Sequence, residues 1–465
     1  MHHRIKGKII LLSACGWVGL AGYVGQAQVV ERGLTPAANT YRSYQDASLN
    51  RDSGLYQPLN LLNDFYPSIE VHIAKHDNVR RRPEFQEEDL LITAMPSLGY
   101  RTNFGRHKFY AAYNGTFTFH QDLTQEDADE HGFNTKLGLD LSRRWDLELF
   151  GSIGETFERR GISGSRDFSS FDNIGIDSGP ERIDYLTYGA DLIFGRKIGL
   201  VQGVLGYDYR STGYTTNNLD DLENFADSRD RTSESIHLDI NWQFADRTSV
   251  FGRVQKTDIE YDRRDNDLDS SQVNYLLGLR WKPVNSLSGA LGVGVTRKDF
   301  SNPAREDFDG SVYYANLGYA INPFSNLSIN ASRTIEEPGD VSADFYESDL
   351  IALGWSHALT PRWSFDVYAK SINDDFNNGR RDDFFDWGGE LTYAWRSWLS
   401  ASLYYGEIER ESNLEGIAYD DRYFGLKLRS DLRHFFKRSS DENQIEPISF
   451  GKVTRLEAVK PKGRK

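Results

Sequence analysis

The sequence predicts an all-β chain: an antiparallel, up-and-down transmembrane β-barrel of about 18 strands, with short periplasmic turns and long extracellular loops. The 465 residues are polar on average, with 38% hydrophobic residues and a mean hydropathy of −0.59, yet 13% are aromatic, which argues against disorder. Segments of ten to fourteen residues alternate in polarity, as half-buried strands do. The connections between these segments alternate between short and long, which is typical of outer-membrane barrels.

The N-terminus predicts a secretory signal over residues 1–27. Three basic residues precede an apolar stretch over 9–25, and small residues precede a cleavage site after Ala27. A bacterial lipobox ending at Cys15 is the alternative, although the apolar core before that cysteine is short. Cleavage after Ala27 removes the only cysteine and three basic residues, which takes the formal net charge from −15 to −18. The mature chain then has no disulfide framework.

Two polar segments flank the predicted barrel, which spans residues 65–432. Residues 28–64 carry scattered tyrosines and are expected to form a periplasmic lead or, alternatively, a plug in the lumen. Residues 433–465 contain nine basic and four acidic residues, and we expect a basic periplasmic tail that is solvated or contacts an anionic partner.

Within the barrel, residues 235–244 show the alternation most clearly, because every even residue is apolar and every odd residue is polar. The same period of two recurs along the chain and predicts membrane-crossing strands. The predicted strands lie near 65–77, 89–102, 108–120, 133–142, 145–158, 183–195, 198–211, 232–244, 248–262, 271–282, 287–299, 310–322, 327–336, 346–358, 363–375, 384–395, 398–410 and 418–431.

Connection lengths assign the two rims. Two to four residues, such as 143–144 or 360–362, join each even strand to the next odd one, whereas longer loops such as 121–132 and 376–383 join each odd strand to the next even one. An even number of strands places both ends of the barrel on the short-turn, periplasmic side. A β-propeller or two tandem sandwiches are the soluble alternatives, but no recurring blade motif is present.

Tryptophans gather near the short turns. We interpret them as a girdle at the membrane interface, which favours a membrane barrel over a soluble one. The girdle residues are Trp145, Trp242, Trp281, Trp355, Trp363, Trp395 and Trp398.

Eighteen strands leave a lumen that side chains alone do not fill, so the sequence predicts a water-filled or plugged pore. Polar strand residues are the candidates to line it. They are Lys136, Glu148, Asp140, Asp208, Asp239, Arg253, Arg280, Asp366, Tyr368, Lys370, Lys427 and Arg429, with Tyr207 and Tyr209 beside them.

The sequence lacks the catalytic motifs expected of an enzyme. The sequence has no nucleophile elbow, phosphate-binding loop or metal-ligand motif, so no cofactor, metal site or nucleic-acid partner is predicted. Ser235, His237 and Asp239 share one strand face, but steps of roughly 6–7 Å along a strand are too long for a hydrogen-bonded triad. Acidic loops such as 262–269 are expected to be solvated, with divalent-cation binding as the alternative.

Several segments resemble the outer-membrane family often called beta-barrel porin type two. The resemblance covers roughly residues 65–431, and it departs from the family after Tyr423–Leu428, where about thirty residues follow the strand that would end the barrel. The matching segments are Tyr66–Val71, His76–Val79, Tyr207–Tyr209, Tyr261–Asp262, Lys298–Phe300 and Ala331–Glu337.

The resemblance implies an exit pore in the bacterial outer membrane for an exopolysaccharide, because members of the family are commonly encoded with polysaccharide secretion genes. It also implies insertion into outer-membrane lipid by the barrel-assembly machinery and cooperation with a periplasmic polysaccharide export protein. A diffusion porin for small-solute uptake and a structural or adhesive surface barrel remain the alternatives.

Overall fold

The computed structural model describes residues 65–158, 160–162, 180–195, 200–215, 227–245, 247–263, 267–284, 286–339 and 343–432. The predicted signal peptide, the lipobox alternative at Cys15, the lead or plug over 28–64 and the basic tail over 433–465 lie outside these residues and stay predictions.

Eighteen strands make up the described chain, which confirms the predicted fold class and strand number. Their alternating polarity and their many β-branched and aromatic residues suit a wall with one apolar face. The strands are β1 (Phe65–His76), β2 (Asp89–Phe104), β3 (His107–His120), β4 (Ala128–Asp140), β5 (Trp145–Glu158), β6 (Glu181–Phe194), β7 (Val201–Thr215), β8 (Arg231–Ala245), β9 (Thr248–Tyr261), β10 (Ser270–Val284), β11 (Leu287–Phe300), β12 (Phe308–Asn322), β13 (Ser325–Glu336), β14 (Tyr346–Ala358), β15 (Trp363–Phe376), β16 (Arg381–Arg396), β17 (Leu399–Ser412) and β18 (Tyr419–Asp431).

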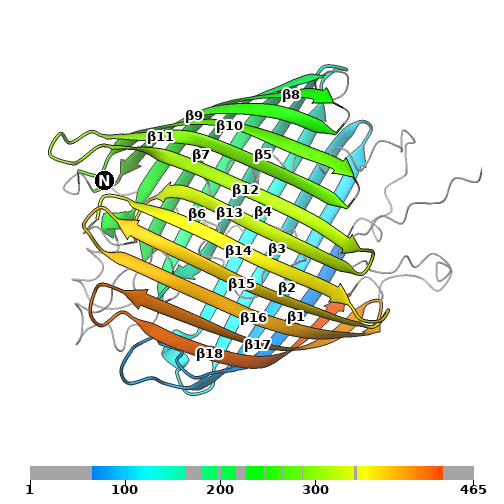
Figure 1. The fold of residues 1–465 in the computed structure, drawn as a ribbon, viewed down its shortest axis with the longest axis vertical. Coiled ribbons are helices and arrows are strands. Elements are labelled where there is room, and N and C mark those ends of the chain that lie inside the picture. Colours follow the sequence, from blue (N-terminus) through cyan, green and yellow to red (C-terminus); the bar gives the residue numbers. More distant parts are fainter. Residues whose placement is uncertain are drawn as a thin grey trace, which may run out of the picture.

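The sheet closes on itself. Each strand pairs antiparallel with the next in sequence, and β1 pairs with both β2 and β18, from Ser68 opposite Asp431 to His76 opposite Tyr423. Figure 1 shows the tilted strands winding around one barrel. Closure leaves no strand edge, as a sheet in lipid requires, since each backbone polar group there must be paired within the protein.

The two rims differ as the sequence predicts. Short connections such as 359–362 follow the even strands, and the longer described connections, such as 77–88 and 301–307, follow the odd strands. The largest boundary difference is at β4, which begins at Ala128 inside the predicted loop 121–132, because Ala128–Gly132 continue the ladder opposite β3. Two single 3₁₀ turns, Thr124–Glu126 and Asp227–Arg229, lie in loops on the long-loop rim. Among the described residues, no helix is long and apolar enough to cross a membrane.

Candidate functional site: the channel interior and its mouth

The two faces of the wall differ in character. On β8, Ile236, Leu238 and Ile240 are about half exposed, whereas His237 and Asp239 between them are buried. Large exposed apolar side chains recur at alternate positions around the wall. Because cross-strand partners lie on the same face of a sheet, the register extends this assignment from strand to strand. The exposed apolar face is the outer, lipid-facing surface, and the polar face lines the interior.

The register places all of the predicted pore-lining candidates on the interior face. Which of them a passing solute contacts stays a prediction. The residues are Lys136 and Asp140 on β4, Glu148 on β5, Asp208 on β7, Asp239 on β8, Arg253 on β9, Arg280 on β10, Asp366, Tyr368 and Lys370 on β15, and Lys427 and Arg429 on β18.

Tyr207 and Tyr209 do not share that face, so their assignment to the lumen is wrong. Both pair with outward residues of β6, and the ring of Tyr209 stacks on that of Tyr188 with centroids 4.8 Å apart. Successive strand residues point to opposite faces. Asp208 between them therefore points inward, and its two neighbours point outward.

Several interior candidates are brought together as ion pairs. Lys136 Nζ lies 2.5 Å from Glu148 Oε2, and Lys370 Nζ lies 2.9 Å from Asp386 Oδ2. Arg253 binds Asp239 through two guanidinium nitrogens, an arrangement that fixes both side chains.

The other candidates take different partners. Arg280 donates to the side-chain oxygen of Asn241 at 3.2 Å, and its guanidinium lies 4.0 Å from the centre of the Phe251 ring. Lys427 pairs with Glu390. Arg429 lies 3.8 Å from Glu70.

The structure keeps Ser235, His237 and Asp239 on separate partners. Ser235 Oγ lies 2.7 Å from the hydroxyl of Thr257. His237 Nδ1 lies 3.2 Å from Asp208, and Asp239 is held by Arg253. This arrangement ties neighbouring strands together. Within the described ranges, no group of three or more His, Cys, Asp or Glu side chains is arranged to hold a metal ion.

Rings on the interior face lie over glycines. At eight positions in the described chain, a ring covers a glycine directly opposite on the neighbouring strand, and a Cβ added to that glycine would meet the ring at or inside contact distance. A ring that lies flat in this way covers bare backbone without projecting into the lumen. The pairs are Phe150 on Gly189, Tyr185 on Gly154, His237 on Gly206, Phe251 on Gly278, Tyr314 on Gly292, Tyr368 on Gly388, Tyr404 on Gly425 and Tyr423 on Gly406.

The long-loop end of the interior contains charged side chains that the sequence analysis missed. Arg229, only 1% exposed, donates from Nη1 to Glu158 Oε2 and to the carbonyl of Gly339, each at 2.8 Å, and it also pairs with Glu181. Its guanidinium lies 3.9 Å from the centre of the Tyr214 ring. Burial opposes the charge, but the two carboxylates outweigh it and hold the pKa of Arg229 above its ordinary value.

This arginine joins loops that are distant on the wall. Arg229 precedes β8 and Gly339 follows β13, with β9 to β12 between those strands. The 337–339 segment is held a second time, because Glu337 accepts from the hydroxyl of Tyr261 at 2.7 Å and pairs with the fully buried Lys298.

A second group of contacts also crosses the long-loop end of the interior, which we call the mouth. Tyr419, at the start of β18, donates to the carbonyl of Gly161 at 2.5 Å, and Arg81 donates to that of Arg160 at 3.1 Å. Arg160 in turn pairs with Glu126 at 3.1 Å. Strands β1 to β4 lie between β18 and β5 on the wall. Loops from several hairpins therefore fold over the interior and narrow its long-loop end.

The tryptophans of the predicted girdle lie near the ends of strands that border the short turns, or in such a turn. Its members on strands point outward by register, and Trp145, Trp242, Trp355, Trp363 and Trp395 are clearly exposed. Trp281 is partly covered, and Trp398 lies in the turn before β17. Their role at a membrane interface stays a prediction.

A comparison with protein families matches residues 65–432 to the family described as "Putative beta-barrel porin 2". The chain belongs to this family. It is therefore an outer-membrane β-barrel porin, as the sequence resemblance implied. No curated protein matches the chain.

Solved structures of Pseudomonas aeruginosa proteins match the chain at low sequence identity. OccK5 (OpdH) is 12% identical with a TM-score of 0.42, and the match covers 80% of this chain and 99% of that one. OccK2 (OpdF), also solved in complex with glucuronate, is 13% identical in that complex with a TM-score of 0.44, and the match covers 80% and 99% of the two chains.

Proposed function

We propose that this porin is a diffusion channel for small polar solutes. The observation that supports this proposal is that loops cross the mouth. Arg229 and Tyr419 tie together loops from strands that are far apart on the wall. Buried charges that are paired in this way are costly to separate, because removing one partner leaves the other charge without compensation. The entrance is thereby held narrow.

The interior chemistry suits small hydrophilic solutes. Ion pairs such as Lys136–Glu148 and Lys370–Asp386 line the wall and leave charged and polar atoms along the path. Eight of the rings on the interior face lie over glycines and so leave the lumen open. A path lined by many weak polar contacts allows a solute both to enter and to leave.

Exopolysaccharide export with a periplasmic export protein is the second candidate, and it rests on the resemblance of the segments quoted above to the family. A polymer would have to pass the same loops, which favours the small-solute channel. Deletion of the gene separates the two functions in the cell. Loss of surface polysaccharide with unchanged solute uptake would contradict our proposal.

Liposome swelling with sugars of increasing length tests the proposal on the purified protein. We expect monosaccharides and disaccharides to enter quickly and long oligosaccharides to be excluded. Equal rates for short and long oligosaccharides would contradict a narrow entrance.

The variant Arg229→Gln tests whether the loop contacts set the size limit. It leaves Glu158 and Glu181 without their guanidinium partner and frees the 339 carbonyl, so longer sugars should enter faster. Arg422→Gln is the control, because Arg422 is exposed and points outward from β18. An unchanged size limit in a folded Arg229→Gln barrel would show that the limit lies elsewhere.

A further inference from the structure

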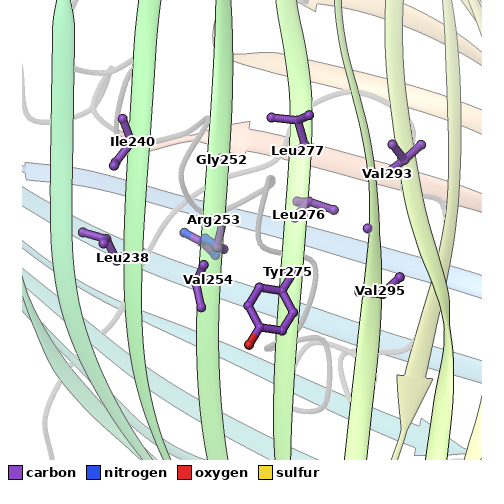
Figure 2. A pocket seen from close by; sticks show the side chains of 11 residues that line it. Leu238, Ile240, Gly252, Arg253, Val254, Tyr275, Leu276, Leu277, Val293 and Val295 are labelled. Atoms are coloured by element: carbon purple, nitrogen blue, oxygen red, sulfur yellow. The ribbon is translucent and has the colours of Figure 1, made fainter.

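The outer surface of β8–β11 carries an apolar groove (Figure 2). Leu238 and Ile240 form one side, and Val293 and Val295 form the other. Its floor includes Gly252, whose missing side chain leaves the centre hollow: an added Cβ would meet only a backbone oxygen, at 3.8 Å.

The groove is wider than one lipid chain. Val254 of β9 and Tyr275 and Leu277 of β10 stand between its two sides (Figure 2). Four strands spaced about 4.8 Å apart span roughly 14 Å, enough for acyl chains to lie side by side. Each of these three side chains is about half exposed, so the surface is available to lipid.

Polarity changes abruptly at one level of the ladder. The row containing Leu238, Val254, Tyr275 and Val295 is apolar apart from the tyrosine hydroxyl. Two residues farther toward the long-loop rim, the next outward row places two cations on either side of Val273. Its residues are Ile236, Lys256, Val273, Arg297 and Asp309.

The two cations are accessible. Lys256 lies 2.7 Å from Asp258 and Arg297 lies 2.7 Å from Asp309, with all four side chains at least half exposed. Exposed ion pairs of this kind contribute little to stability, so a phosphate can replace the carboxylates as partner of the cations. Carboxylates continue in the next row outward, at Asp258 and its neighbours. These carboxylates disfavour a phosphate farther out than the cation row.

We propose that this surface is a binding site for one molecule of lipid A, the phosphorylated, multiply acylated anchor of the lipopolysaccharide in the outer leaflet. Lys256 and Arg297 are two strands apart, about 10 Å, which suits a headgroup with two phosphates better than a phospholipid with one. The long-loop rim is the extracellular rim of such barrels, so the cations lie on the outer-leaflet side of the apolar groove. The acyl chains occupy the groove below them.

Native mass spectrometry of the purified, delipidated full-length protein tests the site. The probes are bisphosphorylated lipid A, the same lipid without phosphates, and phosphatidylglycerol. We expect one bisphosphorylated lipid A to be retained in preference to the other two. The double variant Lys256→Gln/Arg297→Gln should weaken its binding about tenfold or more, as expected for the loss of two charge-assisted contacts.

Gly252→Leu fills the groove without touching the cations and should weaken lipid A binding by a similar factor. Gly389→Leu is the matched control on the outer surface of β16, where an added Cβ makes only ordinary contacts from 3.4 Å. A difference in migration between boiled and unboiled samples establishes that each variant is folded. Wild-type binding by both test variants, or equal retention of the phosphate-free lipid or of phosphatidylglycerol, would overturn the proposal.

Discussion

Eight interior rings occupy little of the lumen because the residue opposite each of them is glycine. Tyr314 is 5% exposed and lies over Gly292, and Phe251 is 4% exposed and lies over Gly278. Any larger residue at these glycines would occupy the space that the ring now fills. The glycines therefore determine how far the rings extend into the lumen.

Replacing one of these glycines should narrow the pore. In Gly292→Val the new side chain overlaps the Tyr314 ring, which must swing away from the wall, and the single-channel conductance should fall by a measurable fraction. Gly389→Val, on the outer surface, should leave the conductance unchanged because its contacts begin at 3.4 Å. If the two folded variants conducted alike, the rings would not control the width of the lumen.

The contacts of Glu337 predict a pH response of the mouth. Burial opposes ionisation of this carboxyl, but Lys298 and Arg231 outweigh it, with the Tyr261 hydroxyl also contributing, so its pKa lies below the ordinary value of 4.5. A lowered pKa means that the contact stabilises the folded loop at neutral pH and that this stabilisation is lost as the pH falls through the lowered pKa. The loop should therefore stay closed to below pH 4.5.

Conductance recorded from neutral pH to about pH 3 checks this. The wild-type channel should open further at the acid end, whereas Glu337→Gln should already be open at neutral pH and respond less. Carboxylates elsewhere in the lumen titrate in both proteins, so the comparison isolates residue 337. Identical pH profiles would contradict the assignment.

At the residue scale, the sequence reveals which face a side chain occupies but not which partner it meets. The alternation in β8 predicts that Asp239 is interior. Once the turn between β8 and β9 is located, the register also predicts that Arg253 is its partner. Arg229 is different, because its partners Glu158 and Gly339 are 71 and 110 residues away. No local period brings them together. Only the closed barrel and its loop paths do.

At the element scale, strand existence follows from local physics. Strict alternation predicted all eighteen strands, and the length of each connection predicted the rim on which it lies. Loop boundaries were less accurate because a strand continues wherever its neighbour offers a partner. The acidic composition of Ala128–Gly132 predicted a loop, yet these residues pair with β3.

Folding should be most sensitive to mutations in the pairing of β1 with β18, because this pairing alone joins the first strand of the barrel to the last. Val71 lies between Leu428 of β18 and Ala94 of β2. Val71→Pro removes a ladder N–H at a position where lipid offers no substitute partner. Such a group costs several kcal/mol.

We therefore expect Val71→Pro to lose the difference in gel migration between boiled and unboiled samples, while Val71→Leu keeps it. A proline variant that still migrates as a compact barrel would show that closure tolerates a gap in this ladder.

On the scale of the whole molecule, interior charge is distributed unevenly. The wall from β4 to β7 carries five carboxylates in the part of the lumen away from the loops, with Lys136 and Arg210 as neighbouring cations. Glu148 lies directly opposite Asp191, and Asp140 directly opposite Asp146; like charges in such positions repel. Asp208 completes the group. On β9 and β10, by contrast, the interior charges among the described side chains are Arg253 and Arg280.

This distribution predicts a cation-preferring channel. Fixed negative charge in a narrow, low-dielectric passage raises the local concentration of cations and lowers that of anions. In a potassium chloride gradient across a planar bilayer, the reversal potential should have the sign for potassium permeation. The triple variant Asp140→Asn/Asp191→Asn/Asp208→Asn should lower the permeability ratio by about a factor of two or more. The preference should also weaken between 0.1 M and 1 M salt, because the screening length falls from about 10 Å to about 3 Å. An anion-preferring wild-type channel, or a triple variant with unchanged selectivity, would show that the carboxylate wall does not face the conducting path.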